Sequence, residues 1–360
     1  EIPFKNIYIH PLVKDEKGQK MSKSKGNVID PIDLIEKYGS DALRFTLTNL
    51  STQGRDIKLS DKLVENSRNF ITKMWNVARF SQFNNFRYDK EFDPQLCELS
   101  VNNWILSRFF EMQKKVIKNL DNFKFNLMIS ELYQFIWGDF CDLYIELSKN
   151  YLKEDKNKKE ISNVFNFVFS RSLNLINPVI PFITEKLGKE LGFIEDSFYN
   201  TKLNVDLNFN FSSKEIDDFK KFIELIQKIR FEIGNNKSNF SLLILSEDKI
   251  NWIDEHVFLL TSIFKFESIE YKKNIISETK NHKILVIFGL KLMIVPSGNL
   301  NFSDQKSLNK KILFYENEIN FFKKKLNNTE FISKAPAKII NEHKNKLEEA
   351  KKNLKLLTQK

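Results

Sequence analysis

QKMSKSKGN, residues 19–27, places three lysines, two serines and a glycine close together in what we call the lysine loop. Before it, NIYIHPLV (6–13) is rich in β-branched and aromatic residues and gives way to the charged KDEKGQK, which predicts a strand that leaves a core and enters an exposed loop. After it, Asp30-Pro31 predicts the start of a helix. The lysine loop is therefore expected to join a strand to a helix.

The residue types of the lysine loop suit an anion. Lysine supplies a point positive charge, while serine hydroxyls and backbone N–H groups donate hydrogen bonds, and together they fit a triphosphate. The GxxxxGK[ST] spacing is missing, so this is not a Walker-type P-loop. On its residues alone, the loop fits a phosphate site and an exposed basic turn equally.

The composition bounds the class of protein. With 360 residues, 41% of them hydrophobic, the chain can build the cores of two or three domains. Lys and Arg exceed Asp and Glu by ten, 57 against 47, which favours a polyanionic partner or an acidic membrane surface, although an ordinary basic protein also fits. Apolar runs are too short to span a membrane and no signal peptide is visible, so a cytoplasmic protein is expected.

Cysteine and histidine usage argues against a metal site. Cys97 and Cys141 are far apart and form no CxxC pair, and the four histidines are isolated. Neither a disulfide framework nor a zinc site is expected. The chain opens Glu1-Ile2-Pro3 without an initiator methionine, which predicts a fragment of a longer protein.

The rest of the chain is mainly helical in pattern. Residues 33–80 follow a helical period, with one buried stripe expected at Leu63, Ser67, Phe70, Met74 and Val77. Long apolar-periodic segments over 96–200 predict an α-helical bundle, and the two prolines of NPVIPFITEKL (177–187) predict a kinked or capped helix junction.

The C-terminal part changes character twice. A linker is expected around 200–213, followed by a helix at 215–233 and by short β-type runs, FSLLILS, FESIEYKK and HKILVIFGLKLMIVPSG, which predict a small α/β domain. Heptad steps then predict an antiparallel helical hairpin, at Leu308, Ile312, Tyr315, Ile319, Phe322 and Leu326 and at Ile340, His343, Leu347, Ala350, Leu354 and Leu357. Residues 305–360 carry an excess of eight positive charges, which is one-sided for a merely solvated helix face.

The string KMSKS, Lys20 to Ser24, is the signature of class I aminoacyl-tRNA synthetases, and the flanking GNVIDPIDLIEKYGSDALRF resembles the subgroup that charges branched aliphatic amino acids. The resemblance implies that the loop closes over ATP, with Mg²⁺, and stabilises charge moving onto pyrophosphate. It implies catalytic roles for Lys23, as the main contact, and for Lys20, with Ser22, Ser24 and Gly26 shaping the ATP-binding loop. Met21 is expected to be its apolar anchor.

Further segments resemble the bacterial-type valyl-tRNA synthetase family: STQGRDIKLS, RNFITKMWNVARF, NNWILSR, FNLMISELYQFIWGDFCDLYIEL, NPVIPFITEKL and FISKAPAKII. The resemblance implies ATP-dependent activation of valine to valyl-adenylate and transfer to tRNA(Val), by a monomer. It also implies a mainly α fold that begins with the end of a Rossmann-type catalytic domain. No HIGH-type motif or editing domain is recognisable, so the chain resembles the C-terminal part of the enzyme and is expected to be inactive alone.

The resemblance divides the chain into a catalytic remnant with the loop (1–30), a helical stem-contact region (31–95), an anticodon-binding bundle (96–200), a linker with a small α/β domain (201–304) and a basic tRNA-binding arm (305–360). Trp137, Phe140 and Tyr144 are spaced along one helix face and fit the core better than base platforms. Expected tRNA contacts in the arm, each of which could equally be a solubility residue, are Lys323, Lys324, Lys325, Lys334 and Lys338.

Three other readings remain open. The chain could be a stand-alone tRNA-binding module with a dead catalytic remnant, or part of another branched-chain synthetase. The isoleucine enzymes, however, commonly end in a cysteine zinc module that this sequence lacks. The coiled coil could also serve protein dimerisation, but self-association alone does not need the lysine excess.

Overall fold

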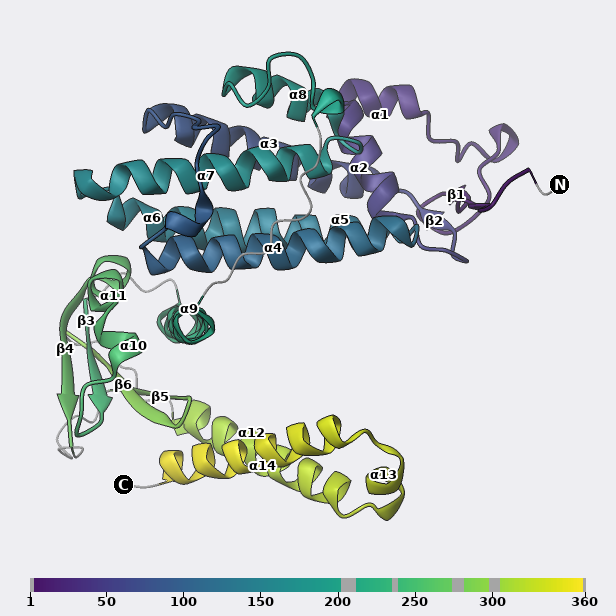
Figure 1. Ribbon diagram of the computed structural model, residues 1–360. Coiled ribbons are helices and arrows are strands. Elements are labelled where there is room, and N and C mark those ends of the chain that lie inside the picture. The colour runs from purple at the N-terminus through teal and green to yellow at the C-terminus, as the bar shows by residue number, and fades with distance from the viewer. Residues whose placement is uncertain (1–2, 202–211, 235–238, 274–281, 298–304, 359–360) are drawn as a thin grey trace. The chain divides into compact units, whose positions relative to one another are not determined.

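The computed structural model describes residues 3–201, 212–234, 239–273, 282–297 and 305–358 (Figure 1). The described residues are mainly helical, as predicted, with two small sheets. They form two compact units, Glu1–Ile216 and Asp217–Lys360. Most of the predicted linker, 202–211, lies outside the described residues.

The first unit opens with a two-stranded parallel sheet of β1 (Val13–Lys14) and β2 (Ile57–Lys58). The prediction of a strand over 6–13 is wrong, because only Val13 of that stretch pairs, and Ile7 and Ile9 are 83% and 80% exposed. β-branched residues favour a strand where a neighbouring strand and a covered face receive them. In this chain β2 offers only two residues for pairing.

Three helices follow: α1 (Pro31–Tyr38), α2 (Ser40–Leu50) and α3 (Asp61–Phe83). The predicted helix start is confirmed, because Asp30 Oδ1 accepts from the backbone N–H of Ile32 at 2.8 Å and Pro31 occupies the first turn. The predicted helical run is wrong over 51–60, where the chain turns at Gly54, which has φ of 76°, and forms β2. The predicted stripe of α3 is buried at Ser67, Phe70, Met74 and Val77 and half-buried at Leu63.

A helical bundle completes the first unit, as predicted. Its members are α4 (Ser100–Asp121), α5 (Phe125–Gln134), the π-helix η3 (Phe135–Tyr144), α6 (Ile145–Tyr151), α7 (Asp155–Ile176) and α8 (Pro181–Glu190). Figure 1 shows α4 and α5 along one side of the unit, with α3 and α7 above them. Fully buried rings fill the space between the helices, each worth about 1.5–3 kcal/mol of transfer free energy, and include Phe70, Phe109, Phe135, Phe140, Phe165 and Phe169.

The second unit holds a four-stranded sheet of order β4-β3-β6-β5, in which only β3 and β4 run parallel. The strands are β3 (Phe240–Leu245), β4 (Phe266–Lys272), β5 (Lys283–Ile287) and β6 (Leu290–Pro296). The helices beside them are α9 (Ser213–Ile233), α10 (Asn251–Asp254) and α11 (Val257–Phe264). This confirms the predicted helix and β-type runs, except that the last run is two strands, joined by a turn in which Phe288 and Gly289 both have positive φ.

The chain ends in a helical hairpin of α12 (Gln305–Leu326) and α14 (Ala337–Thr358), with α13 (Thr329–Lys334) at its tip. Every position of the two predicted stripes is buried or half-buried, with Ile319, Phe322, Ala350 and Leu357 the most enclosed. The predicted coiled-coil seam is therefore confirmed. It leaves the lysines of α12 and α14 largely on the outside.

Candidate functional site

Two side chains, Asp15 and Asn27, frame the lysine loop. Asp15 Oδ1 accepts a hydrogen bond of 2.6 Å from the backbone N–H of Gln19, and Asp15 Oδ2 accepts one of 2.8 Å from Asn27 Nδ2. Asn27 Nδ2 also donates to the carbonyl oxygen of Lys20 at 3.3 Å, and Asn27 Oδ1 accepts from the backbone N–H of Ser22 at 3.0 Å. The bond from Asn27, and next the one from Gln19, lower the pKa of Asp15, so the carboxylate keeps its charge at neutral pH.

Inside this frame the loop makes one tight turn. Residues 23–25 form a single 3₁₀ turn, which Gly26 ends in the left-handed region with φ of 64°, a conformation that suits glycine. The hydroxyls of Ser22 and Ser24 lie 3.3 Å apart. Met21 turns inward, as its predicted role of apolar anchor requires, and packs against a cluster of Leu34, Ala42, Leu43, Leu59 and Val64.

The structure thus brings the predicted ATP-binding residues, Lys20 to Ser24, together in one loop, which the Asp15–Asn27 hydrogen bonds and the packing of Met21 hold in place. The side chains of Lys20, Lys23 and Ser24 are exposed, whereas Ser22 is half-buried. A framed turn that presents ammonium groups and a hydroxyl to solvent is suited chemically to hold a polyanion. Sequence reasoning missed Asp15 and Asn27, because their pairing depends on how the backbone folds between them.

A second missed constellation ties α2 to the α7–α8 junction. The Asp41 carboxylate accepts from the backbone N–H of Ile183 at 2.7 Å and from that of the preceding residue at 3.3 Å. Arg44 Nε donates to the carbonyl oxygen of Val179, and Arg44 Nη2 to that of Pro178, both at 2.9 Å. Burial raises the pKa of Asp41, and its backbone hydrogen bonds partly oppose the rise. Both residues lie in a segment that the sequence singled out, but their partners are some 135 residues away.

The predicted core role is confirmed for Phe140 and Tyr144, which are 1% and 0% exposed, and the Tyr144 hydroxyl donates to Asn102 Oδ1 at 2.9 Å. Trp137 is only half-buried. Lys73 Nζ lies 3.9 Å from the centroid of the Trp137 ring, within cation–π range. Trp137 is therefore the one of the three that borders the surface.

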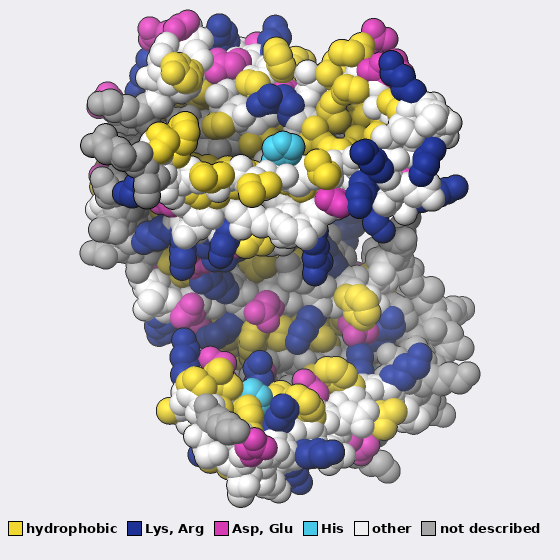
Figure 2. Space-filling view, turned by 90° about the vertical axis from the view of Figure 1, so that its right-hand side faces the viewer, with side chains coloured by type: hydrophobic (Ala, Val, Ile, Leu, Met, Phe, Trp, Pro, Cys, Tyr) yellow, Lys and Arg dark blue, Asp and Glu magenta, His cyan; other side chains and the backbone are white. Residues whose placement is uncertain are grey.

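The arm lysines lie where solvent reaches them. Lys323, Lys324 and Lys325 form the last turn of α12, and Lys338 lies in the first turn of α14; all four are exposed. Lys325 Nζ lies 5.3 Å from the centroid of the Phe331 ring. The side chain of Lys334 lies outside the described part of the structure. The lower part of Figure 2 looks onto the end of the hairpin, where lysine side chains are spread among acidic and hydrophobic ones.

The two cysteines and the described candidate metal ligands do not form a reactive or metal-binding site. Cys97 and Cys141 are free thiols, and burial raises the pKa of each to about 12, so neither is a reactive thiolate at neutral pH. Among the residues that the structure describes, no group of three or more His, Cys, Asp or Glu side chains is placed to hold a metal ion. None of the described helices is both long enough and apolar enough to cross a membrane.

Three family models match successive parts of the chain. Residues 1–60 match "tRNA synthetases class I (I, L, M and V)", residues 102–244 match "Anticodon-binding domain of tRNA ligase", and residues 303–360 match "Valyl tRNA synthetase tRNA binding arm". A valine–tRNA ligase of Pelagibacter ubique is 34% identical over 357 residues, which is 95% of this chain and 40% of the relative. Over nearly its whole length the chain is similar to valine–tRNA ligases.

Other valine–tRNA ligases match the chain over a similar length. The enzyme of Syntrophotalea carbinolica is 34% identical over 375 residues, covering 100% of this chain and 41% of the relative. Among solved structures, LeuRS in a ternary LeuRS–tRNA–LeuAMS complex from Agrobacterium radiobacter K84 is 19% identical, with a TM-score of 0.47 over 66% of this chain and 31% of that one. The chain spans about two fifths of the length of the valine–tRNA ligases that it matches.

Proposed function

We propose that this chain is the part of a valine–tRNA ligase that carries the lysine loop and the regions that recognise tRNA. In this role it takes part in the activation of valine by ATP to valyl-adenylate and in the transfer of valine to tRNA(Val), with AMP and pyrophosphate released. The observation that carries the proposal is the order along the chain: a framed loop with exposed lysines, then an anticodon-domain match, then a basic hairpin.

The lysine loop would act on the triphosphate of ATP, which binds with Mg²⁺. The Asp15–Asn27 frame and the anchoring of Met21 hold the turn in place, so Lys23, with Lys20 beside it, is available to stabilise negative charge that develops on pyrophosphate. Charge that is preorganised in this way costs no rearrangement at the moment of reaction. Loss of Lys23 in a complete ligase is expected to slow valine activation roughly 10²- to 10³-fold, measured by ATP–pyrophosphate exchange.

The remaining regions would recognise tRNA. We assign stem contacts to residues 31–95, anticodon binding to the bundle at 96–200 and phosphate contacts to the arm at 305–360, with 201–304 between them. Four of the five proposed contacts, Lys323, Lys324, Lys325 and Lys338, have exposed side chains, which phosphate binding requires. The proposal extends to a monomer that works in the cytoplasm.

A titration of the full chain against valine tRNA and isoleucine tRNA, at several salt concentrations, tests this function. Phosphate contacts make affinity fall with salt for both tRNAs, whereas contacts to bases distinguish the two. We expect tighter binding of valine tRNA at every salt concentration. Equal affinity for the two tRNAs would contradict the proposed anticodon recognition. Failure to bind either tRNA would contradict the proposed tRNA-binding role as a whole.

A further inference from the structure

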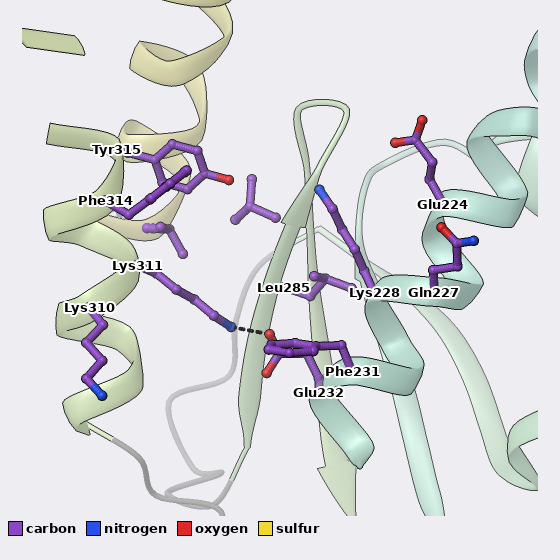
Figure 3. Close-up of a pocket in the computed structure, with 12 residues that line it drawn as sticks. Glu224, Gln227, Lys228, Phe231, Glu232, Leu285, Lys310, Lys311, Phe314 and Tyr315 are labelled. Carbon is purple, nitrogen blue, oxygen red and sulfur yellow. Dashed lines mark hydrogen bonds and ion pairs between the residues drawn. The ribbon is translucent and has the colours of Figure 1, made fainter. Parts of the chain in front are cut away.

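A cleft of about 800 Å³ lies within the second unit, between α9 on one side and α12 on the other (Figure 3). Its apolar base includes Leu285 and Val286 of β5 and Leu357 of α14, each 5% exposed. A cavity of this size with an apolar base and a few polar groups at its walls is the usual form of a small-ligand site.

Two exposed aromatic rings stand on the opposite walls of this cleft. Phe231 belongs to the solvent-facing side of α9, where it follows Glu224, Gln227 and Lys228 at helical spacing, and it is 84% exposed. Phe314 lies on α12 outside the hairpin seam and is 56% exposed. In Figure 3 the two rings project from different helices into the space between them. Packing within the unit does not account for either ring, since both remain largely in water.

An enclosed ion pair fixes the spacing of the two walls. Lys311 Nζ of α12 lies 2.6 Å from Glu232 Oε1 of α9, whose side chain is 7% exposed, and it also donates to the carbonyl oxygen of Ile284 at 2.9 Å. The Lys311 ammonium group is therefore already bound within the protein. Lys228 and Lys310, by contrast, have exposed side chains, one on each wall. The cleft thus combines aromatic rings with accessible ammonium groups, and an ion pair joins its two walls.

We propose that this cleft binds one unpaired nucleotide of RNA, with the base against Phe231 and Phe314 and the phosphate near Lys228. Single-stranded nucleic acids are commonly held by base stacking on aromatic side chains together with basic groups along the backbone. A docked amphipathic helix would need a continuous apolar wall, but the α9 wall carries Glu224, Gln227 and Lys228 beside its one ring. The inference rests on the proposed tRNA-binding function and adds a site to it.

The test uses the full chain and a single-stranded RNA pentamer with 2-aminopurine at its centre, whose fluorescence changes when the base stacks. The variants are Phe231→Ala and Phe314→Ala, with Phe231→Leu and Phe314→Leu as substitutions that keep an apolar side chain but remove the ring. Phe321→Ala is the matched control, because Phe321 is 53% exposed on the same helix α12 but does not line the cleft. Circular dichroism of each variant checks that it is folded.

We expect binding to change the fluorescence, and each cleft variant, alanine or leucine, to weaken binding about tenfold, since stacking on one ring accounts for roughly this loss. Phe321→Ala should bind as the unchanged chain does. Lys228→Ala should make the affinity less dependent on salt. Equal binding by cleft variants and control, or an unchanged fluorescence, overturns the site.

A parallel titration with valine tRNA distinguishes two negative results: that the cleft does not bind a nucleotide, and that the chain does not bind tRNA at all. If the unchanged chain binds tRNA while the cleft variants bind the pentamer normally, only the cleft proposal falls. If the unchanged chain binds neither RNA, the tRNA-binding function falls, and the cleft proposal falls with it.

Discussion

At the scale of single residues, the lysine loop depends on the amide of Asn27. This side chain accepts from the backbone N–H of Ser22 and donates to Asp15 and to the carbonyl oxygen of Lys20. We expect Asn27→Ala to free the Ser22 amide, so that its hydrogen exchange accelerates about two- to tenfold, the effect of losing one hydrogen bond of about 0.5–1.5 kcal/mol. Amide exchange followed by NMR measures this. Lys25→Ala, an exposed change in the same loop, should leave the rate unchanged, and equal rates in both variants would show that Asn27 does not hold the loop.

His256 gives the second unit a dependence on pH. Its ring lies 4.9 Å from that of Phe219 and 5.0 Å from that of Phe222, and burial lowers its pKa from 6.5 to about 4. The unfolded chain then binds the proton more tightly, so stability that is complete above pH 6.5 is lost as the pH falls toward 4. We expect a loss of about 2 kcal/mol between pH 7 and pH 5.

Urea unfolding at the two pH values, followed by NMR signals of residues in the second unit, measures this loss. His256→Phe should reduce the difference between pH 7 and pH 5, whereas His10→Gln, at an exposed position in the first unit, should not. A chemical-shift titration of the His256 ring gives its pKa directly. A midpoint near 6.5 would contradict the expected effect of burial.

The same residues mark what the sequence could predict of the site. Lys20 to Ser24 are contiguous and carry their chemistry in their types, so the loop was recognisable without coordinates. Asp15 and Asn27 act through one hydrogen bond between side chains twelve residues apart, and Arg44 through bonds to a junction at Val179. Such partners depend on how the backbone folds, and neither residue type nor periodicity specifies them.

At the scale of elements, α8 cannot cap its own start. Its N-cap residue is Ile180, which has no side-chain acceptor, so the N–H groups of the first turn need an acceptor from elsewhere. Asp41 of α2 supplies it. We expect Asp41→Ala to lower the free energy of unfolding of the first unit by about 1–3 kcal/mol, because buried donors lose their partner, and Asp41→Asn to cost less. Urea denaturation measures both, and Asp33→Ala on the exposed face of α1 is the control. An alanine variant as stable as the control would mean that Asp41 does not cap α8.

Elements with one apolar stripe were predictable, as α3 and the hairpin show, because burial of that stripe is what stabilises them. The segment Phe135–Tyr144 was not, and it forms a π-helix inside a longer helix. Its letters, FIWGDFCDLY, are apolar on most sides, so over ten residues they cannot distinguish a period of 3.6 from a wider one. The prediction of a strand over residues 6–13 was wrong for a different reason. Their pattern is typical of a strand, but a strand forms only where a partner strand is present.

At the scale of the whole molecule, positive charge is concentrated in the arm: residues 305–360 hold eight of the ten excess charges. If the arm contacts phosphates, replacing Lys323, Lys324 and Lys325 with alanine removes counterion release at three points. The slope of log affinity for valine tRNA against log salt should then become shallower by about two. A charge-matched variant, Lys214, Lys249 and Lys265 to alanine, at exposed positions between the bundle and the arm that have no assigned tRNA contact, should leave the slope unchanged. Equal changes in the two variants would mean that tRNA senses net charge rather than the arm, and an unchanged slope in both would place its phosphate contacts on other residues.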